Sequence, residues 1–295
     1  MHLSSADLSA AIDPQGAQLS LLRDATGRDL LWHGDPAFWN GRAPILFPIV
    51  GALNEGHFTW RGTRYALPRH GFARGRRFEV IRHNQHEALF RQTADAATRA
   101  VYPFEFELDL LFRMEARALF IKASVRNSGD EILPASLGFH PAFRWPLHND
   151  DDANQRNAAA SREAHFLQFE FDEPAPVRRL DAKGLLIREP QATPVQGRRL
   201  MLSDDIFRDD VLIFDHLQSR RVSYGSAAGQ WLQVTFPDAT HLGIWSKPGA
   251  PFVCIEPWRG VADPAGFAGT LAEKPGTFMV PPGGTESLQM LIEMA

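Results

Sequence analysis

The sequence predicts an all-β protein, a large antiparallel β-sandwich with little helix. The 21 prolines and 23 glycines are spread along the whole chain, and the segments between them are short and rich in strand-forming residues. In the clearest of these segments apolar and polar residues alternate with a period of two, and the longer period of a sustained helix is missing from the sequence. No linker or internal repeat interrupts the pattern, so we expect a single domain over residues 1–295.

Two stretches in the first quarter of the chain predict hairpins. Residues 24–28 read DATGR and separate two apolar runs, as a tight turn would. Residues 58–67 read FTWRGTRYAL, with Arg61 and Gly62 between two halves of strand-like composition. A residue followed by glycine at that point favours a two-residue turn, so we expect antiparallel strands on either side of it.

The strongest strand signal lies in the middle of the chain. In residues 104–115 the even-numbered positions are apolar and the odd-numbered positions are charged, with Leu111 as the exception. Residues 119–126 carry apolar side chains at the odd-numbered positions and polar ones at 122, 124 and 126. The two runs predict an antiparallel pair with one buried face and one wetted face.

The second half of the chain predicts short strands between irregular segments. Residues 149–160 are polar and small, so we expect an exposed loop there, with a short helix as the alternative. Residues 174–199 are rich in turn formers and predict irregular structure. Short β-rich runs predict strands at residues 166–171, 211–214, 231–236, 242–245, 252–255 and 287–292.

Composition disfavours several classes of partner. A net charge of −4 offers no basic surface for nucleic acid. The longest apolar run, residues 44–53, is interrupted by proline and glycine and is too short to span a bilayer. We see no secretory signal, so we expect a cytoplasmic protein without a membrane partner. The single cysteine, Cys254, excludes an intramolecular disulfide and has the setting of a buried, inert thiol.

The stretch richest in chemistry is residues 247–263, KPGAPFVCIEPWRGVAD. A short apolar run ends on Glu256, and we expect Pro257 to stop the strand there, so that a carboxylate leaves the core at a strand end. Trp258 adds a flat apolar face beside it. A lone glutamate is more often a solvated strand terminus than a catalytic group, so Glu256 needs support from elsewhere in the chain.

Two histidines give that support. His70 lies in RHGFAR, residues 69–74, before a glycine that can form a tight turn. His140 lies in GFHPAF, residues 138–143, where the following proline keeps its backbone extended. Each histidine alone is more often structural. Two imidazoles and one carboxylate, each at a strand end, together favour an acid–base site.

These motifs also carry a resemblance to a known family. HGFAR at residues 70–74, GFHPAF at 138–143 and FVCIEPWRG at 252–260 resemble, in order, the three signatures of the aldose 1-epimerase (galactose mutarotase) family. PILFPIVG at 44–51 and the run at 210–214 are similar to motifs of its shorter branch. The resemblance covers most of the chain. It implies a galactose mutarotase-like supersandwich, no cofactor, and interconversion of the α and β anomers of a free aldose.

The resemblance also implies a role for each site residue. Glu256 would be the general base on the O1 hydroxyl and His140 the general acid at the ring oxygen O5, with their roles exchanged on ring closure. His70 would hydrogen-bond the ring oxygen or a neighbouring hydroxyl. Asp210 would bind sugar hydroxyls, and Trp258 would line the floor of the site. As partner we expect only the small-molecule aldose, bound by a monomer or homodimer.

Some positions stay open. Asp209 and Asp215 are alternatives to the aspartate assigned to the sugar hydroxyls. Many relatives carry arginine where this chain has Ala52, and Arg42 or Arg74 could supply the missing cation as a substrate-binding group. A sugar phosphate would need at least two convergent arginines, and the chain offers five near the first motif: Arg42, Arg69, Arg74, Arg76 and Arg77.

Three other functions fit parts of the pattern. A glycosidase could pair Asp210 with Glu256 as its two carboxylates, but it would leave both candidate histidines without a task. A metal enzyme needs clustered ligands, and the close pair His83 and His86 lies in a polar run that favours a hairpin tip, so we expect no metal site. A non-catalytic sugar binder could use the same fold, since fold does not establish function. The acid and base groups together favour an enzyme.

Overall fold

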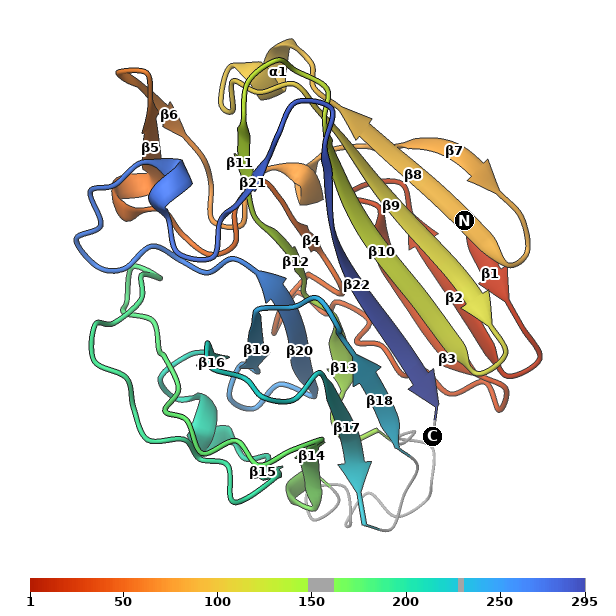
Figure 1. The fold of residues 1–295 in the computed structure, drawn as a ribbon. Helices are drawn as coiled ribbons and strands as arrows, with labels where there is room; N and C mark the ends of the chain where they lie inside the picture. The colour runs from red at the N-terminus through yellow and green to blue at the C-terminus, as the bar shows by residue number, and fades with distance from the viewer. Residues whose placement is uncertain (148–161, 228–230, 295) are drawn as a thin grey trace.

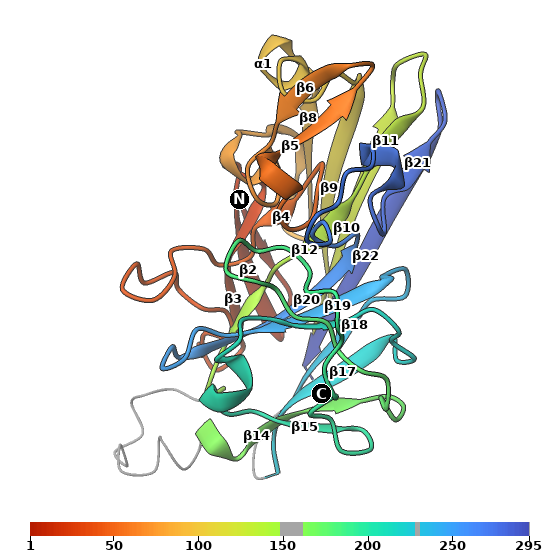
Figure 2. The same ribbon diagram turned by 90° about the vertical axis from the view of Figure 1, so that its left-hand side faces the viewer.

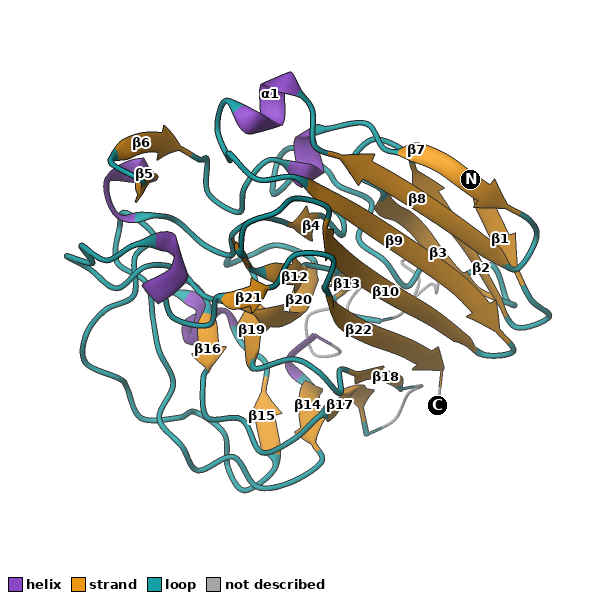
Figure 3. Cartoon of the chain, turned by 45° about the horizontal axis from the view of Figure 1, so that its top comes forward, coloured by secondary structure: helices purple, strands orange, loops and turns teal. Residues whose placement is uncertain are grey.

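The computed structural model describes residues 1–147, 162–227 and 231–294. In these residues antiparallel strands form sheets of nine, six and three strands and two short ribbons (Figure 1). Among these residues helix is confined to α1 (Ala96–Arg99), to residues 162–163 and to short 3₁₀ turns, and helices are coloured purple in Figure 3. The prediction of an all-β fold with little helix is confirmed. The 3₁₀ turns are Asn54–Gly56, Ala73–Gly75, Asp204–Phe207 and Leu271–Glu273.

The nine-stranded sheet forms one layer of the sandwich. Its strands follow the order β15-β14-β17-β18-β22-β10-β9-β8-β7. In that order they are Arg199–Met201, His165–Phe169, Arg221–Ser226, Leu232–Thr235, Thr285–Met294, Ala118–Asn127, Phe106–Glu115, Glu87–Thr93 and Glu79–His83.

The predicted central pair of strands is confirmed in this sheet. β9 and β10 pair along their whole length, from Ala118 opposite Glu115 to Asn127 opposite Phe106. Buried and partly exposed residues alternate along β9, and Leu111 falls among the partly exposed ones. The apolar face is buried in the main core, because a period of two sends every second side chain to the same side of a sheet.

A three-stranded sheet packs against part of this layer. It consists of β1 (His2–Ser4), β2 (Leu8–Asp13) and β3 (Gln18–Asp24), which lie behind β7, β8 and β9 in Figures 1 and 3. Apolar side chains of both sheets belong to one core, and they include Leu3, Ile12, Leu22, Phe90 and Leu110. Burial of these two apolar faces against each other accounts for the sandwich.

The six-stranded sheet carries the candidate site. Its order is β16-β19-β20-β12-β4, and β13 also pairs with β20. In Figure 2, β19 and β20 cross the middle of the molecule close to β18 and β22. The strands are β16 (Leu212–Phe214), β19 (His241–Trp245), β20 (Phe252–Arg259), β12 (Leu137–Phe139), β4 (Ile45–Leu46) and β13 (Ala142–Arg144).

The expectation that the strand stops at Glu256 is wrong. β20 continues through Pro257, which pairs with Leu242 of β19, and ends at Arg259. Ile255 donates its N–H to Pro141 in the break between β12 and β13. The nitrogen of Pro257, two residues further on, points to the same side, where β12 pairs with β20 only at Leu137 and Gly138, so the N–H that proline lacks is not needed. A proline is therefore tolerated inside this central strand.

The predicted turns are confirmed. β5 (His57–Trp60) and β6 (Thr63–Ala66) pair through Arg61 and Gly62, which both have positive φ, at 49° and 78°. The turn at residues 24–28 is closed by the N–H of Asp24 donating to Arg28. The histidines at 83 and 86 lie at the tip of the β7–β8 hairpin. A further ribbon pairs β11 (Leu133–Ala135) with β21 (Phe278–Val280).

Two expectations need separate mention. The predicted loop at residues 149–160 lies outside the described residues. Among the helices that are described, none has the length and apolar character needed to cross a bilayer.

Candidate active site

A cavity of about 310 Å³ opens beside the six-stranded sheet. Strands β16, β19 and β20 contribute its floor, and loops from both halves of the chain contribute its rim. This volume lies at the lower end of what small-molecule sites use. The lining residues are Trp39, Val50, Gly51, Arg69, His70, Arg74, His140, Leu180, Asp210, Val211, Ile213, Trp245, Glu256, Trp258 and Ala262.

The strand register places His140 next to Glu256. Gly138 of β12 faces Trp258, and Ala142 of β13 faces Cys254. Halfway between these pairs, His140 stands opposite Glu256 across the break between the two short strands. Side chains in directly opposite positions lie within reach of each other. The Nε2 atom of His140 is 3.1 Å from Oε2 of Glu256.

Burial sets the protonation of this pair. His140 is 8% exposed and Glu256 is 1% exposed. Loss of water raises the pKa of Glu256 well above its usual value and lowers the pKa of His140 to about 3. Both shifts favour the uncharged form, a carboxylic acid beside a neutral imidazole. The pair therefore holds one transferable proton and one nitrogen able to accept it, and the two groups titrate together.

His70 is held in one tautomer by the backbone of Gly51. The N–H of Gly51 donates to Nδ1 of His70 at 3.2 Å, and the N–H of His70 donates back to the carbonyl of Gly51 at 2.8 Å. Because an N–H can only donate, Nδ1 is the acceptor and the ring proton lies on Nε2. Burial, followed by the charge of His140, lowers the pKa of His70. His70 thus offers the cavity a neutral donor, with its ring centre 5.9 Å from that of His140.

A buried ion pair supports the backbone that holds His70. Lys274 donates to Asp263 at 2.8 Å, with side-chain exposures of 0% and 3%. Asp263 accepts from the N–H of Asn54 and donates its own N–H to Ala52, so it fixes the chain next to Gly51. A β-carbon on Gly51 would lie 2.5 Å from Ala262, which makes glycine necessary there. Sequence reasoning missed this pair, because nothing local marks a lysine in a turn as buried.

Trp258 lies on the floor of the cavity between two glycines. A β-carbon on Gly138 would lie 2.8 Å from Cδ1 of Trp258, and one on Gly243 would lie 2.6 Å from its six-membered ring. Gly138 is directly opposite Trp258, and Gly243 is opposite Glu256. The indole therefore lies flat across both neighbouring strands, and a side chain at either glycine would push it away.

Two further tryptophans of the site were not identified from the sequence. Trp39 stacks on the ring of His140, with centres 4.8 Å apart and planes at 28°. Trp245 meets the ring of His140 edge-on at 5.9 Å. Both line the cavity. The available signal was an aromatic residue beside a turn, which is too common to single them out.

The arginines at the cavity differ from those expected. Arg74 lines it as predicted and donates to the carbonyl of Arg69, and Arg69 lies 3.8 Å from Asp210. An ideal β-carbon on Gly184 would lie 3.4 Å from the guanidinium of Arg69 and 3.7 Å from Cβ of Ala52. Arg69 and Ala52 therefore both approach Gly184, whereas the sequence suggests Arg42 or Arg74 as the cation that replaces the arginine of relatives.

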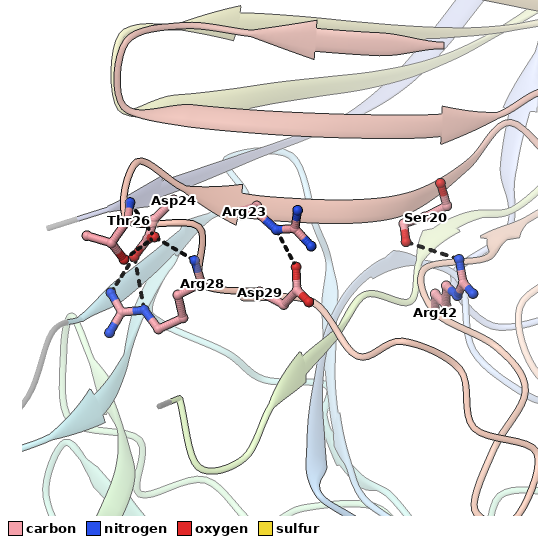
Figure 4. A network of polar contacts seen from close by, with 7 residues as sticks. All are labelled: Ser20, Arg23, Asp24, Thr26, Arg28, Asp29 and Arg42. Carbon is pink, nitrogen blue, oxygen red and sulfur yellow. Dashed lines mark hydrogen bonds and ion pairs between the residues drawn. The ribbon is translucent and has the colours of Figure 1, made fainter. Parts of the chain in front are cut away.

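Arg42 does not line this cavity, and its assignment as a substrate-binding residue is dropped. Its guanidinium donates to the carbonyl of Ser20 (Figure 4) and to the carbonyl of His33, so it holds the loop after β3. Among the three candidate aspartates, Asp210 lines the cavity, whereas Asp209 lines a neighbouring hollow and Asp215 lies 3.9 Å from Arg178. The structure thus brings six of the seven predicted site residues to one cavity.

Three polar atoms of the cavity residues are buried without a hydrogen-bond partner. They are Nδ1 of His140, Oε2 of Glu256 and Nε1 of Trp258. The 3.1 Å approach of Glu256 to His140 is close enough for a hydrogen bond but is not aligned as one. Unpaired buried polar groups each cost roughly 1–3 kcal/mol, so such a cluster indicates a site built for a polar ligand.

The arrangement can move protons between two oxygens of one bound molecule. A donor and an acceptor stand side by side, a neutral imidazole N–H faces them, and aromatic rings border the space. Such a set performs general acid–base chemistry on a polar molecule that has an apolar face.

The chain is similar to several known proteins over most of its length. A family model described as aldose 1-epimerase matches residues 1–270. The structure of a galactose mutarotase related enzyme from Lactobacillus acidophilus superposes with a TM-score of 0.88 and 30% identity, covering 100% of this chain and 97% of that one. A galactose mutarotase-like protein from Lactobacillus casei gives a TM-score of 0.90 at 27% identity, covering 100% and 99%. Protein LacX (plasmid) from Lactococcus lactis is 28% identical over 93% of this chain and 92% of its own.

Proposed function

Because this chain belongs to the aldose 1-epimerase family, we propose that it is a mutarotase that interconverts the α and β anomers of a free aldohexose. The observation that carries the proposal is the contact between His140 and Glu256 at the floor of the cavity. An acid and a base that share one proton are what ring opening requires. The reaction needs no cofactor, since every proton transfer uses a side chain.

The proposed reaction runs in two halves. Glu256, as carboxylate, takes the proton from the O1 hydroxyl, and His140, as imidazolium, delivers a proton to O5 while the C1–O5 bond breaks. The C1–C2 bond then rotates, and the same groups act in reverse to close the ring on the other face. The starting state requires the shared proton to move from Glu256 to His140. The charge of Arg69 lowers the pKa of Glu256, which favours release of that proton, and it also lowers the pKa of His140, which opposes its acceptance.

The remaining residues would bind and orient the sugar. His70 presents its Nε2–H to the ring oxygen or a neighbouring hydroxyl. Asp210 and Arg74 at the rim suit equatorial hydroxyls, because carboxylates accept and guanidiniums donate. The faces of Trp258 and Trp39 suit the apolar C–H surface of a pyranose.

The test is mutarotation itself. Fresh α-glucose and α-galactose are followed by polarimetry, and by NMR of the anomeric protons. We expect catalytic amounts of the protein to raise the rate of equilibration well above the spontaneous rate, without changing the final anomer ratio. A protein that only binds sugar would leave the spontaneous rate unchanged, and that result would overturn the proposal.

A hexose 6-phosphate is a second candidate substrate, because two guanidiniums line the cavity against a single rim carboxylate. Arg69 and Arg74 are neighbours, and burial followed by the charge of Arg69 lowers the pKa of Arg74. Two guanidiniums could each donate hydrogen bonds to the oxygens of one phosphate group. If the substrate is phosphorylated, Arg74→Ala should reduce turnover of glucose 6-phosphate far more than that of glucose. Equal losses for the two sugars would favour a neutral aldose.

A further inference from the structure

Cys254 lies beside the acid–base pair and takes no part in the proposed reaction. It stands two residues before Glu256 on β20, so both side chains point to the same face of the strand. The thiol sulfur, a ring nitrogen of His140 and a carboxylate oxygen of Glu256 all lie within 4.8 Å of one another. Cys254 is fully buried, and it is the single cysteine of the chain.

We propose that these three side chains bind a zinc-like divalent ion, and that this ion inhibits the enzyme. One thiolate, one imidazole and one carboxylate are ligand types that Zn²⁺ accepts, and three protein ligands leave a fourth position open. This site departs from the expectation of no metal site, but the ion is an inhibitor and not a cofactor, so the proposed reaction still uses no metal. The binding site stands by itself, whereas the inhibition rests on the proposed function.

The distances fit a tetrahedral ion. Zinc bonds of roughly 2.0–2.3 Å place pairs of ligand atoms roughly 3.3–3.6 Å apart. Nε2 of His140 and Oε2 of Glu256 are already 3.1 Å apart. The sulfur lies within 4.8 Å of a ring nitrogen of His140 and a carboxylate oxygen of Glu256, so a shift of the ligand atoms by about one ångström completes the set.

The surroundings also fit. Oε2 of Glu256 forms no aligned hydrogen bond, so its contact with His140 is the main interaction that changes when it turns to an ion. His140 and Glu256 both line the cavity, which gives the ion a route of entry and leaves the fourth position facing the space for the sugar. Arg69 and Arg74 repel a cation here, while Asp210 at the rim attracts one. A thiolate and a carboxylate together neutralise the two charges of the ion.

Binding releases protons and removes both catalytic groups. The S–H bond of Cys254 breaks as the Zn–S bond forms, and that proton and the shared proton of the acid–base pair leave to solvent. Binding therefore strengthens as pH rises. The lone pair of His140 and the carboxylate of Glu256 are then held by the ion and cannot transfer protons. Mg²⁺ and Ca²⁺ prefer six or more oxygen ligands and should have no such effect.

The first test does not depend on activity. Co²⁺ is titrated into the purified protein as a spectroscopic substitute for Zn²⁺. Because there is one cysteine, a thiolate-to-cobalt charge-transfer absorption in the near ultraviolet must come from Cys254. We expect this band in the wild type, its displacement by Zn²⁺, and its absence in Cys254→Ala and Cys254→Ser. Absence of the band in the wild type would overturn the site, whether or not the protein is a mutarotase.

The second test measures inhibition. Zn²⁺ is added to a mutarotation assay in a non-chelating buffer, with Mg²⁺ in parallel and EDTA to reverse the effect. We expect Cys254→Ala to keep its basal rate and to need at least about tenfold more Zn²⁺ for half inhibition, since it loses a ligand. Cys254→Ser preserves the volume and serves where the alanine variant folds poorly. Equal sensitivity of wild type and both variants would place the inhibitory ion elsewhere and overturn the proposal.

Discussion

The strands β9 and β20 differ in which of their residues are buried. β9 alternates buried and partly exposed residues along its length, and its wetted face carries ion pairs such as Arg91 with Asp109. β20 has seven of its eight residues buried, among them a carboxylate and a thiol. In β9 each residue except Leu111 is where its polarity predicts. In β20, Glu256 is buried against the preference of a charged group for water.

The difference separates residues that stabilise the fold from residues that we propose for catalysis. Apolar burial on β9 and β10 lowers the free energy of the folded state. Burial of Glu256 raises that free energy, as its raised pKa indicates, and the partnerless atoms around it add to the cost. The structure tolerates this because the rest of the core is large. Departures from the packing rules therefore indicate where a site lies.

The largest expected effects come from one substitution in each region. Glu256→Gln removes the proposed base while keeping its shape, so we expect turnover to fall by about a hundredfold or more. Stability should stay level or rise, because an uncharged amide replaces a group that burial disfavours. Phe112→Ala empties a buried site on β9 and should lower the free energy of unfolding by about 3–5 kcal/mol without changing KM.

Mutarotation rates and urea unfolding of both variants check this contrast. Ile121→Val, expected to cost about 1 kcal/mol, serves where Phe112→Ala is too unstable to purify. A Glu256→Gln variant that keeps normal turnover would remove this residue from the mechanism. A β9 variant that loses turnover while folded would break the division between the two regions.

The sequence was most informative where local rules and tertiary packing agree. The alternation in β9 and the turn at Arg61 and Gly62 each follow from a few adjacent residues, and both are confirmed. The motifs around His70, His140 and Glu256 could be found as well, since each combines a titratable group with proline or glycine.

The rest depended on pairing between distant segments. The contact of His140 with Glu256 follows from the register of β12 and β13 on β20, which no local pattern fixes. The same pairing explains why β20 continues through Pro257, contrary to expectation. Arg69 at the cavity, and Arg42 away from it, are determined by loops whose course the sequence leaves open.

The dependence of stability on pH is a further way to compare the site region with the packed face of β9. The folded pKa of His140 is about 3 against 6.5 in an unfolded chain, so between these values the unfolded state binds the extra proton. This histidine therefore contributes stability above pH 6.5 that is lost as pH falls towards 3. The lowered pKa values of His70 and His241 act in the same direction, and the raised pKa of Glu256 acts in the opposite one.

We expect His140→Asn to lose less stability on acidification. Between pH 7 and pH 4 the fall in the free energy of unfolding should be smaller than in the wild type by about 3 kcal/mol. Denaturant titrations at the two pH values measure it, and Phe112→Ala is the control, because it removes no titratable group. An unchanged fall in His140→Asn would mean that the imidazole is protonated in the folded protein.

The smallest expected effect concerns the fit of Trp258 on the floor of the site. Gly243→Ala places a methyl group 2.6 Å from the indole and must displace it, at a cost of about 1–3 kcal/mol in stability. Gly75→Ala is the matched control, since nothing lies within 4 Å of its β-carbon, and it should change stability by less than about 0.5 kcal/mol.

If the indole stacks on the sugar, Gly243→Ala should also raise KM by about tenfold with a smaller change in kcat, because the lost contact is made in both ground and transition states. Thermal unfolding and initial rates over a range of sugar concentrations measure both effects. A Gly243→Ala variant that matches Gly75→Ala in both would show that the indole moves freely, and the site region would then tolerate added volume better than the packed face of β9 does.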